Sequence, residues 1–121
     1  MDIAPHQLGT LGGGNHFIEV GQNKRGEYGV TIHSGSRNAG HSIASYYMNK
    51  ARLLDLNSKL GKAYVKDMGW ALNYALANRT LILQLTLEAI FGRTFKKLPE
   101  TRSTFLNENH NHAEIQLGNR L

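Results

Sequence analysis

The chain has 121 residues, of which 40% are hydrophobic, so its length and composition suit one globular domain with a modest core. Its 14 Lys and Arg exceed its 9 Asp and Glu, and the resulting charge of +5 suits a polyanionic partner such as RNA or a nucleotide, although many soluble domains carry such a charge. The absence of cysteine excludes disulfides and thiolate metal ligands within the chain. No signal peptide and no apolar run of about 18 residues occur, so we expect a cytoplasmic protein without a membrane span.

The first half of the chain predicts two short strands with small-residue loops around them. Three consecutive glycines exclude a regular element in the opening loop, and alternating apolar residues favour strands after it. In chain order these are loop 9–16, strand 17–20, polar turn 22–26, strand 28–33 and loop 34–40. We therefore expect an antiparallel hairpin with His16 and His33 at its ends.

The second half of the chain predicts two helices. Apolar residues recur at helical spacing from about residue 41 to 56, and again over a longer stretch from about residue 62 to 91. A polar break at 57–61 separates the helices, and Gly92 is a typical helix stop. On the longer helix we expect Trp70 to anchor the core.

This order of elements predicts an α+β fold in a single domain over residues 1–121. Two strands do not form a stable sheet alone, so we expect an incomplete sheet that other segments or another chain would finish. Its exposed edges favour oligomerisation or instability.

The first candidate site is the glycine loop that ends in Asn15 and His16. Glycines let backbone N–H groups approach an anion, and an Asn and a His where the loop meets the strand can contact a phosphate or a metal. The loop matches neither the P-loop nor the GxGxxG motif. Taken alone, it fits a tight turn with an incidental histidine better.

The second candidate site is the segment from His33 to Arg37, where hydroxyls lie between a histidine and an arginine. Arg37 can bind a phosphate through two N–H groups at once. An equally good interpretation is a serine turn that leads into a helix, with Arg37 solvated.

The third candidate site is His110-Asn111-His112. Residues at i and i+2 share a face of a strand, so two imidazoles, or one of them, can hold a divalent metal. Viewed in isolation, a polar tail that faces only solvent explains these residues equally well.

Four stretches of the chain together resemble the RtcB family of RNA ligases, in the family's order and over nearly the whole chain. They are LGTLGGGNHFIEV at 8–20, HSGSR at 33–37 with Gly40 and His41, WALNYALANR at 70–79, and HNHAE at 110–114. The first stretch is long and specific. The resemblance implies a partial RtcB-like domain.

The resemblance implies a ligase that uses GTP and manganese to join an RNA 3′-phosphate or 2′,3′-cyclic phosphate end to a 5′-hydroxyl end, through a histidine–GMP intermediate. It implies His16, His33 and His110 as manganese ligands and Arg37 as a phosphate contact. The implied contacts of the guanine nucleotide are Asn15, His16, Phe17, Ile18, Glu19, His110 and Asn111.

The chain departs from the family pattern in the groups that complete the chemistry. The family's upstream Asp and Cys metal ligands have no match here, and its guanylylated histidine would lie beyond residue 121. The segment around 52–61 is shortened, and Asn38-Ala39 replaces a more usual small pair. We therefore expect the chain alone to form no GMP adduct and to seal no RNA, unless a complementing chain supplies these groups. A homo-oligomer is the other protein partner that we expect, because of the exposed sheet edges.

Two further hypotheses remain open at the level of the sequence. One is a non-catalytic remnant that binds metal or nucleotide, and the other is a basic RNA-binding module without a metal role. Manganese titration of the His16→Ala and His33→Ala variants separates the metal-binding readings from the last one.

Overall fold

The computed structural model describes residues 4–92 and 106–109, and it has the α+β layout that the sequence predicts. In chain order the elements are α1 (Ala4–Gln7), β1 (Phe17–Gln22), β2 (Tyr28–His33), α2 (Arg37–Lys50) and α3 (Lys59–Phe91). The described sheet has two antiparallel strands, as expected for an incomplete sheet. Within the described ranges, no helix is both long and apolar enough to cross a membrane.

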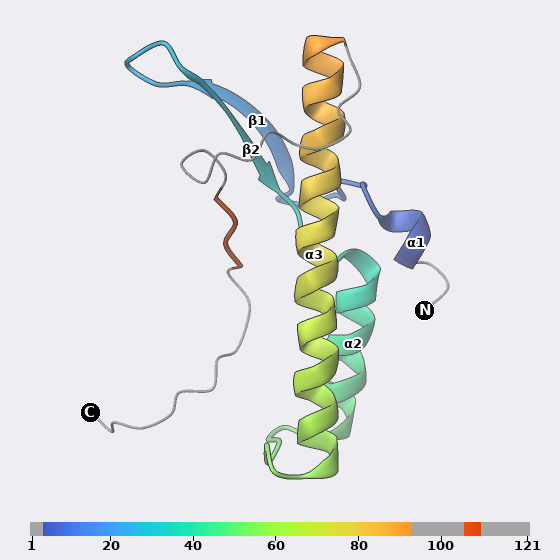
Figure 1. Cartoon of the computed structure of the whole chain (residues 1–121). Coiled ribbons are helices and arrows are strands. Elements are labelled where there is room, and N and C mark those ends of the chain that lie inside the picture. The colour runs from blue at the N-terminus through green and yellow to red at the C-terminus, as the bar shows by residue number, and fades with distance from the viewer. Residues whose placement is uncertain (1–3, 93–105, 110–121) are drawn as a thin grey trace, which may run out of the picture.

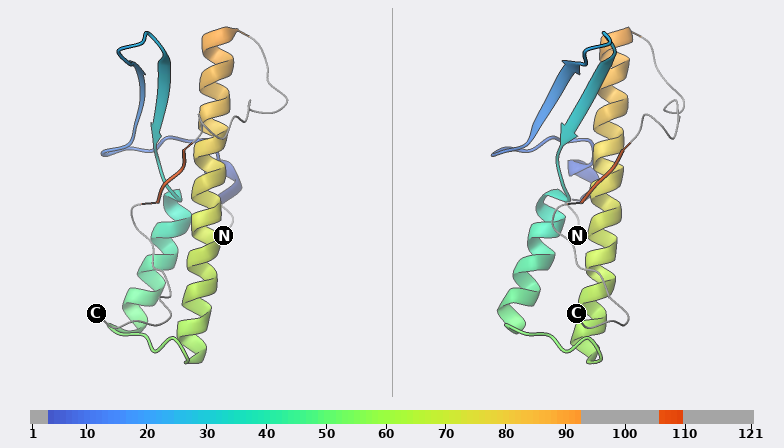
Figure 2. Two further views of the ribbon diagram at one scale, coloured as in Figure 1. Left: turned by 60° about the vertical axis from the view of Figure 1, so that its left-hand side comes forward. Right: turned by 90° about the vertical axis from the view of Figure 1, so that its left-hand side faces the viewer.

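Helix α3 is the element against which the others are arranged. Its 33 residues make a rod of about 50 Å. Helix α2 runs along its first half and the hairpin lies beside its second half (Figures 1 and 2). The Ser58 side chain caps its start by accepting a hydrogen bond from the N–H of Gly61. At its end Gly92 is left-handed, which confirms the predicted stop.

The hairpin has two faces of different character because side chains alternate along each strand. Its register pairs Ile18 with Ile32 and Val20 with Val30, which gives one apolar face. On the other face, Phe17 is paired with His33. The Asn23 side chain closes the turn by accepting hydrogen bonds from the N–H groups of residues 25 and 27. The predicted hairpin is confirmed, with the first strand longer than expected.

Helix α2 differs from its prediction at both ends. It begins at Arg37 rather than near residue 41, and it ends at Lys50 rather than near residue 56. Ala51 has extended backbone angles, with φ −161° and ψ 147°, and this ends the helix. Leu53, which the predicted helix included, is 91% exposed in the loop that follows. The break between the two helices also lies earlier than the expected 57–61, because α2 ends at Lys50. The Ser58 side chain caps α3, so this helix begins at Lys59 rather than near residue 62.

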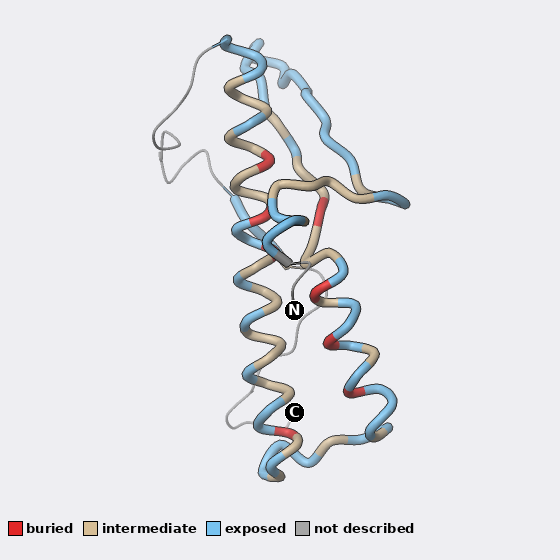
Figure 3. Tube along the Cα trace, turned by 90° about the vertical axis from the view of Figure 1, so that its right-hand side faces the viewer, coloured by how far each residue is buried: buried red, intermediate tan, exposed pale blue. Residues whose placement is uncertain are grey.

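The core lies between α2 and α3 and continues toward the hairpin (Figure 3). Its apolar members are Ala39, Ile43 and Tyr47 from α2, and Ala75 and Ile82 from α3. The prediction that Trp70 anchors this core was wrong, since its side chain is 44% exposed. At 100° per residue, Trp70 lies about 140° around the helix from Ala75 and so points away from α2.

Candidate functional site

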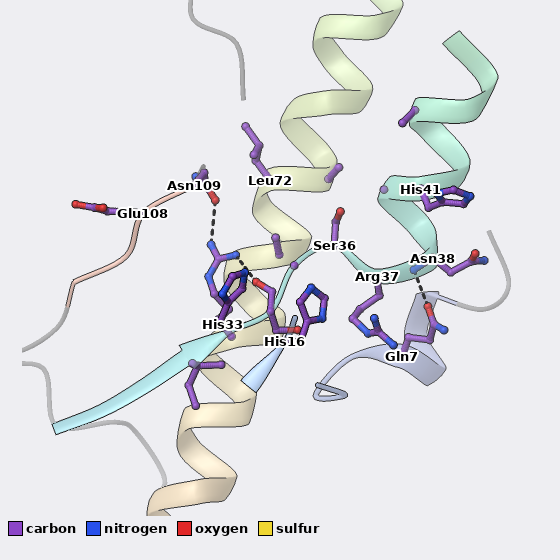
Figure 4. A pocket seen from close by; sticks show the side chains of 18 of the residues that line it. Gln7, His16, His33, Ser36, Arg37, Asn38, His41, Leu72, Glu108 and Asn109 are labelled. Atoms are coloured by element: carbon purple, nitrogen blue, oxygen red, sulfur yellow. Dashed lines mark hydrogen bonds between the residues drawn. The ribbon is translucent and has the colours of Figure 1, made fainter. Parts of the chain in front are cut away.

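A cleft of about 1550 Å³ opens where the hairpin, the start of α2 and the middle of α3 meet. It brings together side chains from segments far apart in the sequence (Figure 4). The predicted site residues that line it are His16, Phe17, His33 and Arg37. His41 and Arg79 also line it. Glu108 is the only acidic residue among the described residues that line the cleft. The guanidinium groups of Arg37 and Arg79 therefore suit an anionic ligand.

His16 and His33 face each other across the end of the hairpin. Their ring centroids are 5.6 Å apart, and the ring of Phe17 meets that of His33 edge-on at 5.2 Å. The pairing of Phe17 with His33 in the hairpin explains this closeness, since His16 directly precedes β1 and His33 ends β2. The structure therefore brings together two of the three imidazoles that the sequence predicts at one centre.

The hydrogen bond of His16 fixes which ring nitrogen can bind a cation. Nδ1 lies 2.8 Å from the carbonyl oxygen of Leu11. A carbonyl only accepts, so Nδ1 carries the proton in the neutral ring and Nε2 keeps its lone pair. A backbone carbonyl behind one ring nitrogen is the common arrangement for a histidine that binds metal through the other.

The predicted third imidazole, His110, lies outside the described residues, as does Asn111. Among the residues that the structure does describe, no group of three or more His, Asp or Glu side chains is placed to hold a metal. The three-histidine manganese centre therefore stays a prediction. Asn109, the residue before His110 in the sequence, lines the cleft.

The other predicted nucleotide contacts are spread over both faces of the hairpin. Asn15 is exposed at the end of the glycine loop, and Glu19 is exposed on the same face as Phe17. Ile18 lies on the opposite face and lines a separate apolar groove against α3. The side chain of Ile18 therefore faces away from the main cleft.

Arg37 is held against the glycine loop in an unusual backbone conformation. Its φ of 56° is positive, which costs a non-glycine residue about 1–3 kcal/mol, and such residues cluster at functional sites. Its Nε–H donates to Thr10 Oγ1 at 3.2 Å. The guanidinium lies beside Gly12, where an added Cβ would be 2.1 Å from Arg37 Nη1 and 2.7 Å from His16 Nδ1. Only glycine at position 12 lets Arg37 and His16 approach each other across the loop.

Asn78 on α3 joins the two loops that carry these residues. Its side chain is fully buried, with 0% exposure. Its Oδ1 accepts from the N–H of Gly9 at 2.7 Å, and its Nδ2 donates to the carbonyls of Thr10 and Gly35 and to Ser34 Oγ, each at 3.1 Å. The amide therefore replaces the hydrogen bonds that both loops lose on burial, and it fixes the loops relative to each other.

Arg79, the next residue along, ties a third segment to the cleft. Its Nη1 donates to the carbonyl of Ser34 at 3.1 Å, and its Nε and Nη2 donate to the side chains of Asn107 and Asn109. Burial lowers the pKa of this guanidinium below its ordinary value. The fork of Arg79 thus holds residues 106–109 beside the loop that follows β2.

No role for Asn78 or Arg79 was predicted from the sequence, and so these two roles were missed. A signal was available, because Asn78 follows Ala75 by three residues and precedes Ile82 by four, so it belongs to the buried stripe of the helix. A polar residue in such a stripe needs partners for its amide. Nothing in the local pattern shows that those partners are two loops near the start of the chain.

Comparison with known proteins identifies the family. The profile of the family described as tRNA-splicing ligase RtcB matches residues 2–119. A curated tRNA-splicing ligase RtcB from Pyrobaculum aerophilum is 34% identical over 120 residues, which covers 71% of this chain and 25% of the relative. The chain therefore spans about a quarter of that relative's length, and no solved structure gives a significant match. With its family profile matched over almost its full length, the chain belongs to the RtcB family of tRNA-splicing ligases.

Proposed function

We propose that this chain provides part of the metal- and nucleotide-binding centre of an RNA ligase that depends on GTP and manganese. The reaction joins a 3′-phosphate or 2′,3′-cyclic phosphate end to a 5′-hydroxyl end through a histidine–GMP intermediate. The observation that carries the proposal is the pair of imidazoles 5.6 Å apart, with the Arg37 guanidinium beside His16 in an open cleft. Membership of the family supports the ligase chemistry.

The donor atoms of the cleft fit a divalent cation of manganese type. Imidazole nitrogen is an accepted ligand for such borderline metals, and the lone pair of His16 is kept at Nε2 by the Leu11 carbonyl. Two imidazoles alone leave most coordination positions of the metal open. We propose that His110 adds a third imidazole ligand. Bound manganese would supply charge neutralisation at the phosphate oxygens.

The remaining work of the site falls to the chain's own side chains. Arg37 is proposed to hold a phosphate oxygen through two N–H groups, and the closeness of its guanidinium and the His16 ring to Gly12 supports this role. Asn15 and the backbone from Phe17 to Glu19 are proposed to contact the nucleotide, together with His110 and Asn111. Phosphoryl and nucleotidyl transfer depends mainly on such positioning and charge compensation, so a preformed cleft is what the reaction needs.

Manganese binding by the full 121-residue chain tests the proposal. The free Mn²⁺ signal in electron paramagnetic resonance should fall when wild-type protein is added, and more so with GTP. His16→Ala and His33→Ala should each lose most of this uptake. His6→Ala is the matched control, because His6 is exposed and does not line the cleft. Equal uptake by all four proteins, or none by the wild type, would reject the metal centre.

A further inference from the structure

One stripe of α3 outside the cleft combines aromatic and basic side chains. Lys62, Lys66, Trp70 and Tyr74 follow one another at four-residue steps, and we call them the aromatic–basic track. Each step advances about 6 Å along the helix and turns about 40° around it, so neighbouring members are within side-chain reach. The track thus covers about 18 Å of the helix surface.

The aromatic part of the track presents an open ring to solvent. The rings of Trp70 and Tyr74 are stacked, with centroids 5.4 Å apart and an interplanar angle of 21°. Trp70 is 44% exposed, although a tryptophan usually gains much by burial. A large, oriented and exposed ring is the feature on which a nucleobase stacks, whatever its sequence.

The charge of the track is uniformly positive. Lys62 and Lys66 are exposed, and the acidic residues of α3 are Asp67 and Glu88 alone. Asp67 is turned toward α2, where it accepts a hydrogen bond from the Tyr47 hydroxyl. Glu88 lies more than three helical turns beyond Tyr74. The track therefore complements a polyanion.

The track ends at the candidate site. Tyr74 directly precedes Ala75, which lines the cleft together with Arg37. Burial raises the pKa of Tyr74, and the positive charge of Arg37 offsets part of that rise. Arg37 in turn lies beside Gly12 and His16. A strand with a phosphate at Arg37 would find its next bases at Tyr74 and Trp70, and its outer phosphates near the two lysines.

We propose that the aromatic–basic track binds single-stranded RNA that leads away from the cleft, with one base stacked on Trp70 and the phosphates beside Lys66 and Lys62. This inference rests on the proposed function only for the choice of RNA as the polyanion. The binding itself needs neither manganese nor GTP.

The sole tryptophan of the chain makes the contact directly observable. The test uses the 121-residue chain, EDTA and a 5′-labelled oligouridylate of about 12 nucleotides with hydroxyl ends, a length within the usual range for single-strand sites. We expect the oligonucleotide to quench the tryptophan fluorescence, while the anisotropy of the oligonucleotide's label rises.

The variants test which side chains make the contact. Trp70→Leu should weaken binding roughly ten-fold or more, because one base–aromatic stack is lost, and Trp70→Phe should keep most of the affinity. Lys62→Ala/Lys66→Ala should lower the slope of log affinity against log salt by about 1.4.

Matched controls lie on the hairpin. Tyr28 is 76% exposed, so Tyr28→Leu removes an exposed aromatic ring away from the track, and Lys24→Ala/Arg25→Ala removes two charges at the turn. Both should bind as the wild type does. If Trp70→Leu loses its fold by circular dichroism, Trp70→Phe and the double lysine variant decide the matter. No binding, binding without quenching, or equal effects of track and control variants would overturn the proposal. Because the assay contains neither metal nor GTP, such a result would not argue against the proposed manganese centre.

Discussion

Asn78 accepts a hydrogen bond at 2.7 Å from the N–H of Gly9, which lies 69 positions earlier in the chain. The same amide holds the loop after β2 through Gly35 and Ser34. The two loops that carry His16 and Arg37 are therefore set against each other by one buried side chain. Their relative position is a property of α3 as much as of the loops.

Replacing Asn78 by alanine should lower the free energy of unfolding by roughly 3 kcal/mol, because it leaves three partly buried backbone groups without this partner, at up to about 1–3 kcal/mol each before relaxation. Chemical denaturation followed by circular dichroism measures this. Asn73→Ala is the control, since Asn73 is exposed on the same helix and its loss should change stability by no more than about 0.5 kcal/mol. Equal effects of the two variants would show that the buried amide has no special role.

Gly12→Ala should disrupt the site with a moderate loss of stability. Gly12 has a φ of +89°, and an added Cβ would collide with the Arg37 guanidinium. We expect weaker binding of manganese and GTP, measured by paramagnetic resonance and calorimetry, together with a destabilisation of about 1–3 kcal/mol. Gly13→Ala, one position along, meets nothing within 4 Å and should bind as the wild type does. Equal ligand binding and equal stability of the Gly12→Ala and Gly13→Ala variants would contradict this explanation.

The pair of Tyr47 and Asp67 should make stability depend on alkaline pH. The hydrogen bond to the Asp67 carboxylate, with burial, raises the pKa of Tyr47 from 10.0 to about 12. A raised pKa means that the folded state keeps a proton that the unfolded state has lost. The stabilisation that this pair gives to the folded state is therefore complete below about pH 10 and is lost as the pH rises toward 12.

Tyrosinate absorbance should show one tyrosine that ionises near pH 12 and that moves to lower pH in Asp67→Asn. In Tyr47→Phe, the part of the alkaline loss of stability that this pair causes should vanish, while Tyr28→Phe, at an exposed position, should leave it in place. A pH profile that is the same in all of these proteins would rule out the pair as its source.

Arg79→Lys should loosen residues 106–109 while leaving α3 intact. A lysine keeps the charge but cannot hold Ser34, Asn107 and Asn109 with one planar fork. Hydrogen exchange at the backbone of residues 107–109 should become faster in this variant. Arg52→Lys, at an exposed loop position, should have no such effect. Unchanged exchange would mean that the segment is held by other contacts.

We predict that the 121-residue chain incubated with labelled GTP and Mn²⁺ takes up no covalent GMP, because the family resemblance implies a nucleophilic histidine that is not among its matched residues. Gel autoradiography under alkaline conditions, which preserve a phosphoramidate, measures this. A full-length family member serves as the positive control. Covalent labelling of the isolated chain would show that another residue acts as the nucleophile.

Much of the fold could be predicted from the sequence because its causes are local. Alternating apolar residues with a polar turn specify the hairpin, and its register then brings His33 beside Phe17 and so near His16. Helical periodicity with Gly92 specifies most of α3. Where sequence reasoning failed, several conformations were locally acceptable, as at the end of α2, where leucines at helical spacing lie in a loop.

The sequence by itself determined the family, the elements and the residue types available for chemistry. Only the tertiary structure decided that Trp70 faces solvent and that Asn78 faces two loops, because burial depends on which side of α3 its neighbours cover. The close approach of Arg37 to Gly12 and Thr10 was decided in the same way. Such contacts join groups that are distant along the chain, and no local propensity encodes the surface on which they meet.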